Sequence, residues 1–218
     1  MCLLRSQFLG KEMIDVFDNV LEEHNAILID DEVKKMTWRY NYHSDKRKPN
    51  KMWHVLCGHD EEECGKLGYL WAHDLFQTFT NKLDFVKKYK IDGYKRIYCN
   101  AHTHGVEPHI HKDDGDFTMI YYPYLNWETE WGGGTAIFEE EENDESSPLY
   151  AEEFKNLQID KHVNYRGNRL IVFDAHLSHQ AQPVSRQCYE LRTCVVFKCN
   201  ISGNSRERLD FYKENKNG

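Results

Sequence analysis

Apolar residues in the first 91 positions recur mainly at helical spacing. Between residues 67 and 88 they recur every three or four positions, which predicts an amphipathic helix that faces a core. These residues are Ala72, Leu75, Phe76, Phe79, Leu83 and Val86. A second helix is predicted over residues 22–36. Residues 37–42 alternate polar and aromatic side chains, which predicts a half-buried strand, and residues 13–17 are a further short candidate strand.

From residue 92 to residue 200 the pattern changes to short runs of β-branched and aromatic residues. Clusters of Gly, Pro, Asn and Asp separate these runs. The runs predict strands at residues 94–99, 117–122, 135–138, 170–173 and 191–197. Several short strands at such intervals are typical of a sandwich or barrel. The acidic run over residues 139–145 is interpreted as a solvated loop.

The 218 residues contain no internal repeat and no Gly/Ser linker, so we expect a single domain over residues 1–218. Residues 1–91 would form a support of helices and strands, residues 92–200 a β core, and residues 201–218 a polar tail. The expected fold class is α+β with a mainly β core, on which the N-terminal helices pack.

Charge and composition make several classes of protein less plausible. The 28 Lys and Arg against 36 Asp and Glu give a net charge of −8, which disfavours nucleic acid as a partner. No apolar run approaches the roughly 18 residues that a membrane helix needs, so we expect no membrane span. The N-terminal apolar stretch is too short for a signal peptide, and the seven irregularly spaced cysteines suit reduced thiols. These features favour a cytoplasmic location.

One short segment carries a histidine and a carboxylate two residues apart. On a strand, His111 and Asp113 would project from the same face, so this segment could supply two metal ligands. A hydrophobic strand at residues 170–173 leads to two further histidines, His176 and His179. Two histidines and one carboxylate form the facial triad of non-haem Fe(II) oxygenases, which leaves positions on the metal open.

The surrounding sequence resembles the prolyl-4-hydroxylase-like family of 2-oxoglutarate- and Fe(II)-dependent dioxygenases. The matching motifs are Tyr98-x-Asn100, Gly105, His111-x-Asp113, Tyr124-Leu125-Asn126, Trp131-Gly132-Gly133-x-Thr135-x-x-Phe138, Gly167-x-Arg169-Leu170-Ile171-Val172-Phe173, His179-x-x-x-Pro183-Val184 and Arg192. They occur in the family's order between residues 92 and 200. The resemblance implies a double-stranded β-helix, which is a kind of jelly roll, with a metal inside its mouth.

The resemblance also implies that His111, Asp113 and His179 bind Fe(II) at the catalytic centre. His179 matches the third ligand better than His176 does, because Pro183 follows it at the family's spacing. An intact Asp113 favours hydroxylation, since halogenating relatives lose this carboxylate.

A further implied residue is a basic side chain that pairs with the far carboxylate of 2-oxoglutarate. Arg192, which directly precedes an apolar strand run, matches this position. Arg186 is the competitor, but it follows Pro183 in an expected turn. A guanidinium suits the role because its planar fork meets a carboxylate through two hydrogen bonds. Two positions further along the strand, Cys194 would share the face of Arg192.

Three tyrosines match cosubstrate-contacting positions of the family. Tyr124 and Tyr98 match directly, and Tyr122 replaces Tyr124 if the register differs. Pro123 raises this alternative, because a proline inside a strand indicates an edge or a bulge. His102 and His104 share a face near the expected mouth, and the simpler interpretation is that they are exposed loop histidines.

The implied activity is hydroxylation of a C–H bond, most closely of a prolyl residue in a protein or peptide. 2-Oxoglutarate and O₂ would be converted to succinate and CO₂. The resemblance also implies dependence on ascorbate (vitamin C), which is common in the family. An alternative is a metal-binding, cupin-like isomerase or binding module without 2-oxoglutarate chemistry, which would not need Arg192. The sequence also offers a candidate structural zinc site, formed by His54, Cys57, His59 and Cys64, in which Glu61–Glu63 would be a solvated loop.

Overall fold

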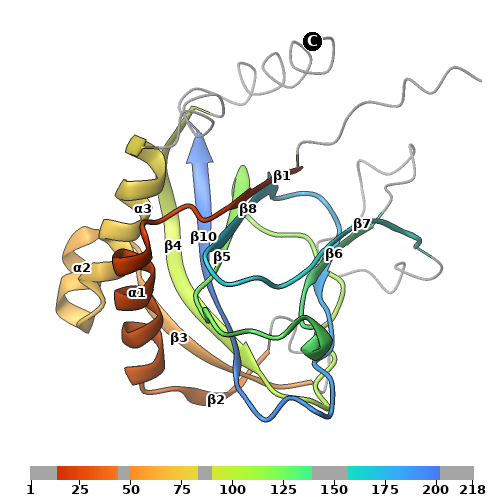
Figure 1. Cartoon of the computed structure of the whole chain (residues 1–218). Coiled ribbons are helices and arrows are strands. Elements are labelled where there is room, and N and C mark those ends of the chain that lie inside the picture. The colour runs from red at the N-terminus through yellow and green to blue at the C-terminus, as the bar shows by residue number, and fades with distance from the viewer. Residues whose placement is uncertain (1–13, 44–49, 83–89, 139–156, 202–218) are drawn as a thin grey trace, which may run out of the picture.

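The computed structural model describes residues 14–43, 50–82, 90–138 and 157–201, whose strands form two antiparallel sheets (Figure 1). The larger sheet has seven strands in the order β1-β8-β5-β10-β4-β3-β2, and the smaller sheet has the order β7-β6-β9. The larger sheet consists of β1 (Ile14–Asp18), β2 (Arg39–Tyr42), β3 (Met52–Gly58), β4 (Ile91–His102), β5 (Phe117–Tyr122), β8 (Arg169–Asp174) and β10 (Arg192–Ile201). The smaller sheet consists of β6 (Thr135–Phe138), β7 (Ile159–Val163) and β9 (His179–Ala181). The predicted mainly β, jelly-roll architecture is confirmed.

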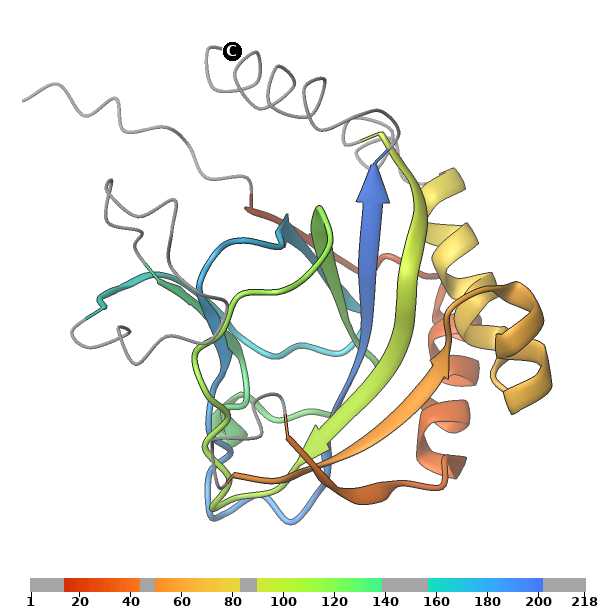
Figure 2. The same ribbon diagram turned by 180° about the vertical axis from the view of Figure 1, so that it is seen from behind.

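Three helices cover one face of the larger sheet, and the smaller sheet lies toward its other face (Figure 1, Figure 2). They are α1 (Glu23–Lys35), α2 (Glu61–Leu67) and α3 (Leu70–Lys82). Val33 of α1 and Phe79 of α3 lie in the same buried cluster as Phe197 of β10. Burial of these apolar side chains holds the helices on the sheet, as predicted for the N-terminal helices.

Strand β10 lies inside the larger sheet, because it pairs with β4 along one edge and with β5 along the other. Its two faces therefore contribute to two different interior regions. Successive side chains of a strand point to opposite faces. Val195 and Phe197 therefore pack in the helix-side core. The alternate residues line the space between the two sheets: Arg192, Cys194, Val196 and Lys198. The candidate site lies on this second face.

The helix predicted over residues 67–88 begins later than expected, at Leu70, and Leu67 belongs to the preceding helix α2. Gly68 follows the last residue of α2 and has φ of 83°, a left-handed conformation that ends the helix and that glycine adopts without strain. The apolar periodicity resumes in α3, whereas residues 83–88 lie outside the described residues. Glu61–Glu63 were predicted to be loop but form the first turn of α2. The Asp60 side chain caps this turn by accepting a hydrogen bond from the backbone N–H of Glu63 at 2.8 Å.

The strands at residues 117–122 and 135–138 are confirmed with the predicted bounds, as β5 and β6. Strands β3, β7 and β9 were not predicted. Pro123 was expected inside a strand, at an edge or a bulge, but it follows the end of β5, and the pairing of β5 with β8 is regular up to Tyr122. The acidic run at residues 139–145 and the tail from residue 202 lie outside the described residues. In the described part of the chain, no helix is both long and apolar enough to cross a membrane.

Candidate metal centre

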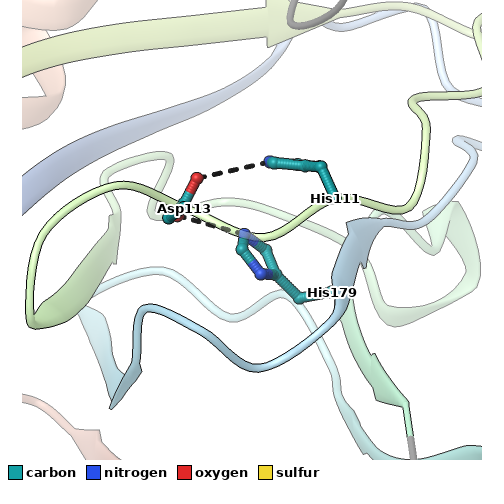
Figure 3. A group of neighbouring side chains, drawn as sticks. All are labelled: His111, Asp113 and His179. Atoms are coloured by element: carbon teal, nitrogen blue, oxygen red, sulfur yellow. Dashed lines mark ion pairs between the residues drawn. The ribbon is translucent and has the colours of Figure 1, made fainter. Parts of the chain in front are cut away.

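Two histidines and one aspartate converge between the two sheets (Figure 3). His179 begins β9, and a β-bridge joins it to His111: the backbone N–H of each donates to the carbonyl of the other, at 3.0 and 2.9 Å. The backbone N–H of Asp113 donates to the carbonyl of Ala175 at 2.7 Å, which fixes the Asp113 end of the segment that carries both ligands. One potential ligand atom from each of His111, Asp113 and His179 lies within 4.8 Å of the other two.

Backbone carbonyls orient both imidazole rings. The Nδ1 atom of His111 lies 2.8 Å from the carbonyl oxygen of His109, and that of His179 lies 2.8 Å from the carbonyl oxygen of Leu177. A carbonyl oxygen can only accept a hydrogen bond, so Nδ1 carries the proton in each neutral ring. The Nε2 lone pairs are then free, and these atoms lie 3.6 Å and 3.2 Å from the oxygens of Asp113. Metal-binding histidines use this arrangement.

Burial and neighbouring charges set the protonation of this group. Burial lowers the pKa of His111 to about 4, with a further contribution from His179. Burial alone would raise the pKa of Asp113, but the positive charge of Lys198 and the proximity of His179 outweigh it, so this pKa lies well below its usual range. Neutral imidazole and ionised carboxylate are the forms that bind a divalent cation, so the donor set fits iron.

A cavity of about 110 Å³ adjoins the three side chains and is lined by inward-facing residues of β4 and β10. The pairing of these strands sets Arg192 opposite His102 and Lys198 opposite Arg96. The cavity thus extends along the strands from Arg192 at one end to Lys198 at the other.

Arg192 is 2% exposed, and not all of its donors are satisfied by the residues that the structure describes. Its Nε donates to the carbonyl of Gly133 at 2.8 Å, and its Nη1 lies 3.3 Å from the Sγ of Cys194. Its Nη2 has no hydrogen-bond partner among the described residues. A buried donor without a partner costs free energy, so this atom indicates an anionic ligand. A carboxylate fits best, because it pairs with the planar guanidinium.

The three predicted tyrosines occupy different places. Tyr98 of β4 lines the cavity. Tyr122 does not line it but lies behind Arg192: its hydroxyl is 2.7 Å from the Oγ1 of Thr135, and the guanidinium carbon lies 5.3 Å from its ring centroid. Tyr124 does not line the cavity either, and its ring packs edge-on against Trp127. Direct contact of Tyr122 or Tyr124 with a cosubstrate stays a prediction that these positions do not favour.

The competing side chains lie elsewhere. His176 is 48% exposed at its side chain and hydrogen-bonds Asp174, while Arg186 is exposed in a turn; neither lines the cavity. His102 was expected in an exposed loop, but it lies at the buried end of β4 and lines the cavity. His104 is exposed, as expected.

The proposed zinc ligands do not form a site among the described residues. His54 bonds to Asn100, Cys57 lies 3.8 Å from the sulfur of Cys99, and His59 pairs with Glu63. The only set of three or more potential ligands found in the described part of the chain is His111, Asp113 and His179.

Lys198 and Thr118 also contact Asp113 but were not predicted as site residues. The signal for Lys198 was available: it lies six residues after Arg192 in the same apolar run, and an even spacing on a strand means the same face. Thr118 carried no comparable signal, because its position depends on the pairing of β5 with β10.

Gly133 lies against Arg192, and a side chain there is expected to disturb it. Gly133 has φ of 73°, and a Cβ atom would lie 3.1 Å from the Cγ of Arg192. We expect Gly133→Ala to lower the free energy of unfolding by about 1–2 kcal/mol through backbone strain and by about 1–3 kcal/mol more through overpacking. It should also weaken binding of 2-oxoglutarate, the anion expected at Arg192. Urea denaturation and a cosubstrate titration measure the two effects.

Gly105→Ala is the matched control, because Gly105 has φ of 82° but open space around its Cβ position. This variant should show the strain alone and bind the cosubstrate normally. Equal effects of the two substitutions on cosubstrate affinity would contradict the role given to Gly133.

His102 should make the fold sensitive to acid. Burial lowers its pKa from 6.5 to about 3, with a smaller effect of Arg192. Between these values the unfolded chain takes up a proton that the folded chain cannot bind, so stability falls as pH falls below about 6.5. The loss attributable to His102 between pH 7 and pH 5 is about 2 kcal/mol. Urea denaturation at both pH values should therefore show a smaller loss for His102→Gln than for the parent. The exposed control His104→Gln should behave like the parent, and an unchanged loss in His102→Gln would refute this origin.

Solved structures with a similar fold include those of the following three proteins. A prolyl hydroxylase from Trichoplax adhaerens, in complex with a hypoxia inducible factor peptide fragment, has a TM-score of 0.52 and 16% identity, covering 90% of this chain and 86% of its own. A prolyl-4-hydroxylase from Pseudomonas putida has a TM-score of 0.53 and 16% identity, covering 87% and 93%. HygX from Streptomyces hygroscopicus, with nickel and 2-oxoglutarate bound, has a TM-score of 0.58 and 12% identity, covering 92% and 88%. At these identities the likeness shows the fold.

A comparison with curated protein sequences gives no match. The sequence model of a protein family does match, over residues 90–198, which is half of the chain and runs from just before β4 into β10. This range contains the two histidines, the aspartate and the buried arginine of the cavity. The chain belongs to the 2OG-Fe(II) oxygenase superfamily.

Proposed function

We propose that the chain is a dioxygenase that uses this cavity to hydroxylate a prolyl residue of a protein or peptide. Fe(II) and 2-oxoglutarate are the cofactor and cosubstrate of its family. In the proposal His111, Asp113 and His179 hold the metal, and Arg192 anchors the far carboxylate of 2-oxoglutarate. The observation that carries the proposal concerns buried Arg192, which lies in the same cavity as the three ligands: its Nη2 has no hydrogen-bond partner in the part of the chain that the structure describes.

When bound, iron with 2-oxoglutarate activates O₂ for insertion of one oxygen atom into a C–H bond, while the other oxygen enters succinate and CO₂ is released. The protein residues supply position and environment. The carbonyls of His109 and Leu177 hold the imidazoles with Nε2 toward the metal. Arg192 is held in turn by the carbonyl of Gly133 and lies over the ring of Tyr122. An anchored cosubstrate would present its keto acid end to the metal.

Two observations support a prolyl substrate. Two structures of similar fold are prolyl hydroxylases, one of them bound to a peptide. The cavity lining also includes apolar side chains from separate segments, namely Tyr42 of β2, Met52 of β3 and Pro108. Such side chains suit the apolar face of a pyrrolidine ring.

The test is incubation of the chain with Fe(II), 2-oxoglutarate, ascorbate and O₂ and a set of proline-containing peptides. We expect a mass gain of one oxygen atom on a prolyl residue, with an equal amount of succinate. Matched peptides with alanine in place of proline, and the His179→Ala variant, should give neither product.

Other outcomes would redirect the proposal. Succinate formation that is stimulated only by non-peptide compounds would overturn the prolyl substrate and leave the dioxygenase activity. Tight metal binding without any use of 2-oxoglutarate would favour the cupin-like alternative.

A further inference from the structure

Lys198 is a buried cation at the metal centre that the proposed chemistry does not use. The residue is 1% exposed and lies on β10, on the same face as Arg192. Its Nζ pairs with the Oδ2 atom of Asp113, lies 3.5 Å from the Oγ1 of Thr118, and is 5.6 Å from the ring centroid of Tyr98. An ammonium group buried this deeply needs a partner of opposite charge, and Asp113 supplies it.

The two oxygens of Asp113 have different surroundings. Oδ2 accepts a hydrogen bond from the Thr118 hydroxyl at 2.7 Å and also pairs with Lys198. A carboxylate oxygen has two lone pairs in its plane, and these two donors occupy both. Both oxygens face a histidine: Oδ1 lies 3.6 Å from the Nε2 of His111, and Oδ2 lies 3.2 Å from the Nε2 of His179. The difference between them is that Oδ2 carries the two donors, which leaves Oδ1 as the oxygen available to a metal.

The number of oxygens that Asp113 contributes matters for the reaction. Carboxylates bind metals through one oxygen or through two. One oxygen together with two imidazoles leaves three positions of an octahedral ion open. A second carboxylate oxygen would take one of these open positions. The cosubstrate needs two of the three positions and O₂ needs the third. Some feature of the protein must therefore keep the second oxygen away from the metal.

We propose that Lys198 and Thr118 are positioning residues that occupy Oδ2 and make Asp113 a one-oxygen ligand through Oδ1. The inference depends on the proposed metal site, but not on 2-oxoglutarate turnover or on the substrate. Lys198 adds a second effect, because its positive charge offsets the negative charge that Asp113 and a bound dicarboxylate bring into the cavity.

The test counts the water molecules on a bound metal ion. Mn(II) is the probe, since its effect on water-proton relaxation depends on the number of waters bound to it. The variants are Lys198→Met, Thr118→Val and the double substitution, which remove the donors with little change in shape. The control is Lys66→Met, because Lys66 is an exposed lysine of α2 that pairs with Glu62.

We expect the double variant to bind Mn(II) and to lose about a third of the parent's relaxivity per bound ion, as one of three open positions closes. The relaxivity of each single variant should lie between those of the parent and the double variant. Lys198→Arg, which keeps a donor and the charge, should have the parental relaxivity, and Lys66→Met should not differ from the parent. Thr118→Val keeps the buried charge pair, so it gives a result even where loss of Lys198 impairs folding.

Two failures are distinguishable. A parent that does not bind Mn(II) or Fe(II) overturns the proposed metal site itself. A parent that binds Mn(II), with variants that retain its full relaxivity, overturns the role of Lys198 and Thr118 alone.

Discussion

Replacing His179 with alanine is expected to abolish metal binding and turnover of 2-oxoglutarate. The substitution removes one of three ligand atoms that converge within 4.8 Å. Loss of an outer residue that merely orients a metal ligand typically costs 10- to 100-fold in affinity, so we expect loss of a ligand to cost more than about 100-fold. Isothermal titration with Fe(II) under anaerobic conditions measures the affinity, and succinate formation measures turnover.

His176→Ala is the matched control for this prediction. His176 lies three residues earlier, in the turn that precedes β9, is about half exposed and hydrogen-bonds Asp174. Its removal should leave metal affinity and turnover close to those of the parent. The assignment would be wrong if His176→Ala lost the metal while His179→Ala retained it.

Replacing Arg192 with methionine should raise the dissociation constant for 2-oxoglutarate by about 30-fold or more, which reflects the cost of losing one partner of a buried charge pair. Metal binding should persist, because Arg192 contributes no ligand atom to the metal group. The fold should also persist, because an apolar side chain of similar length replaces a buried cation, one donor of which is unsatisfied by the described residues. The measurement is a 2-oxoglutarate titration of the iron-loaded variant.

Two further variants make this result specific. Arg186→Met removes the competing arginine, which is exposed in a turn, and should leave cosubstrate affinity unchanged. Arg192→Lys keeps the charge but loses the planar fork, so it should fall between the parent and Arg192→Met. Unchanged 2-oxoglutarate affinity in Arg192→Met would show that the far carboxylate does not bind at this end of the cavity.

The elements that were predictable from the sequence are those whose pattern is local. β5 and β6 are short apolar runs between turn residues, and both were placed with the observed bounds. β7 is a largely exposed strand with little apolar signal, and β9 has three residues that become a strand only by pairing with β6. Their existence depends on pairing between distant segments, which a local pattern does not encode.

The residues of the candidate site were likewise predictable where their signal is local in the sequence. The spacing of His111 and Asp113, together with the family motifs, identified the residues that the structure brings together with His179. Arg192 was separable from Arg186 because one precedes a strand and the other follows a proline. The burial of His102 and the contact of Thr118 with Asp113 were not predictable, because each depends on the register between strands distant in the sequence. Tyr124 matched a motif, yet it lies outside the cavity lining.

The most direct test of the account is an anaerobic titration of the metal-free chain with Fe(II) and then with 2-oxoglutarate, followed by visible absorption. Chelation of iron by the keto acid end of 2-oxoglutarate produces a charge-transfer band. We predict this band in the parent, its absence in His179→Ala, and its appearance only at much higher 2-oxoglutarate concentration in Arg192→Met. A folded, iron-loaded parent that shows no band at any 2-oxoglutarate concentration would contradict the account.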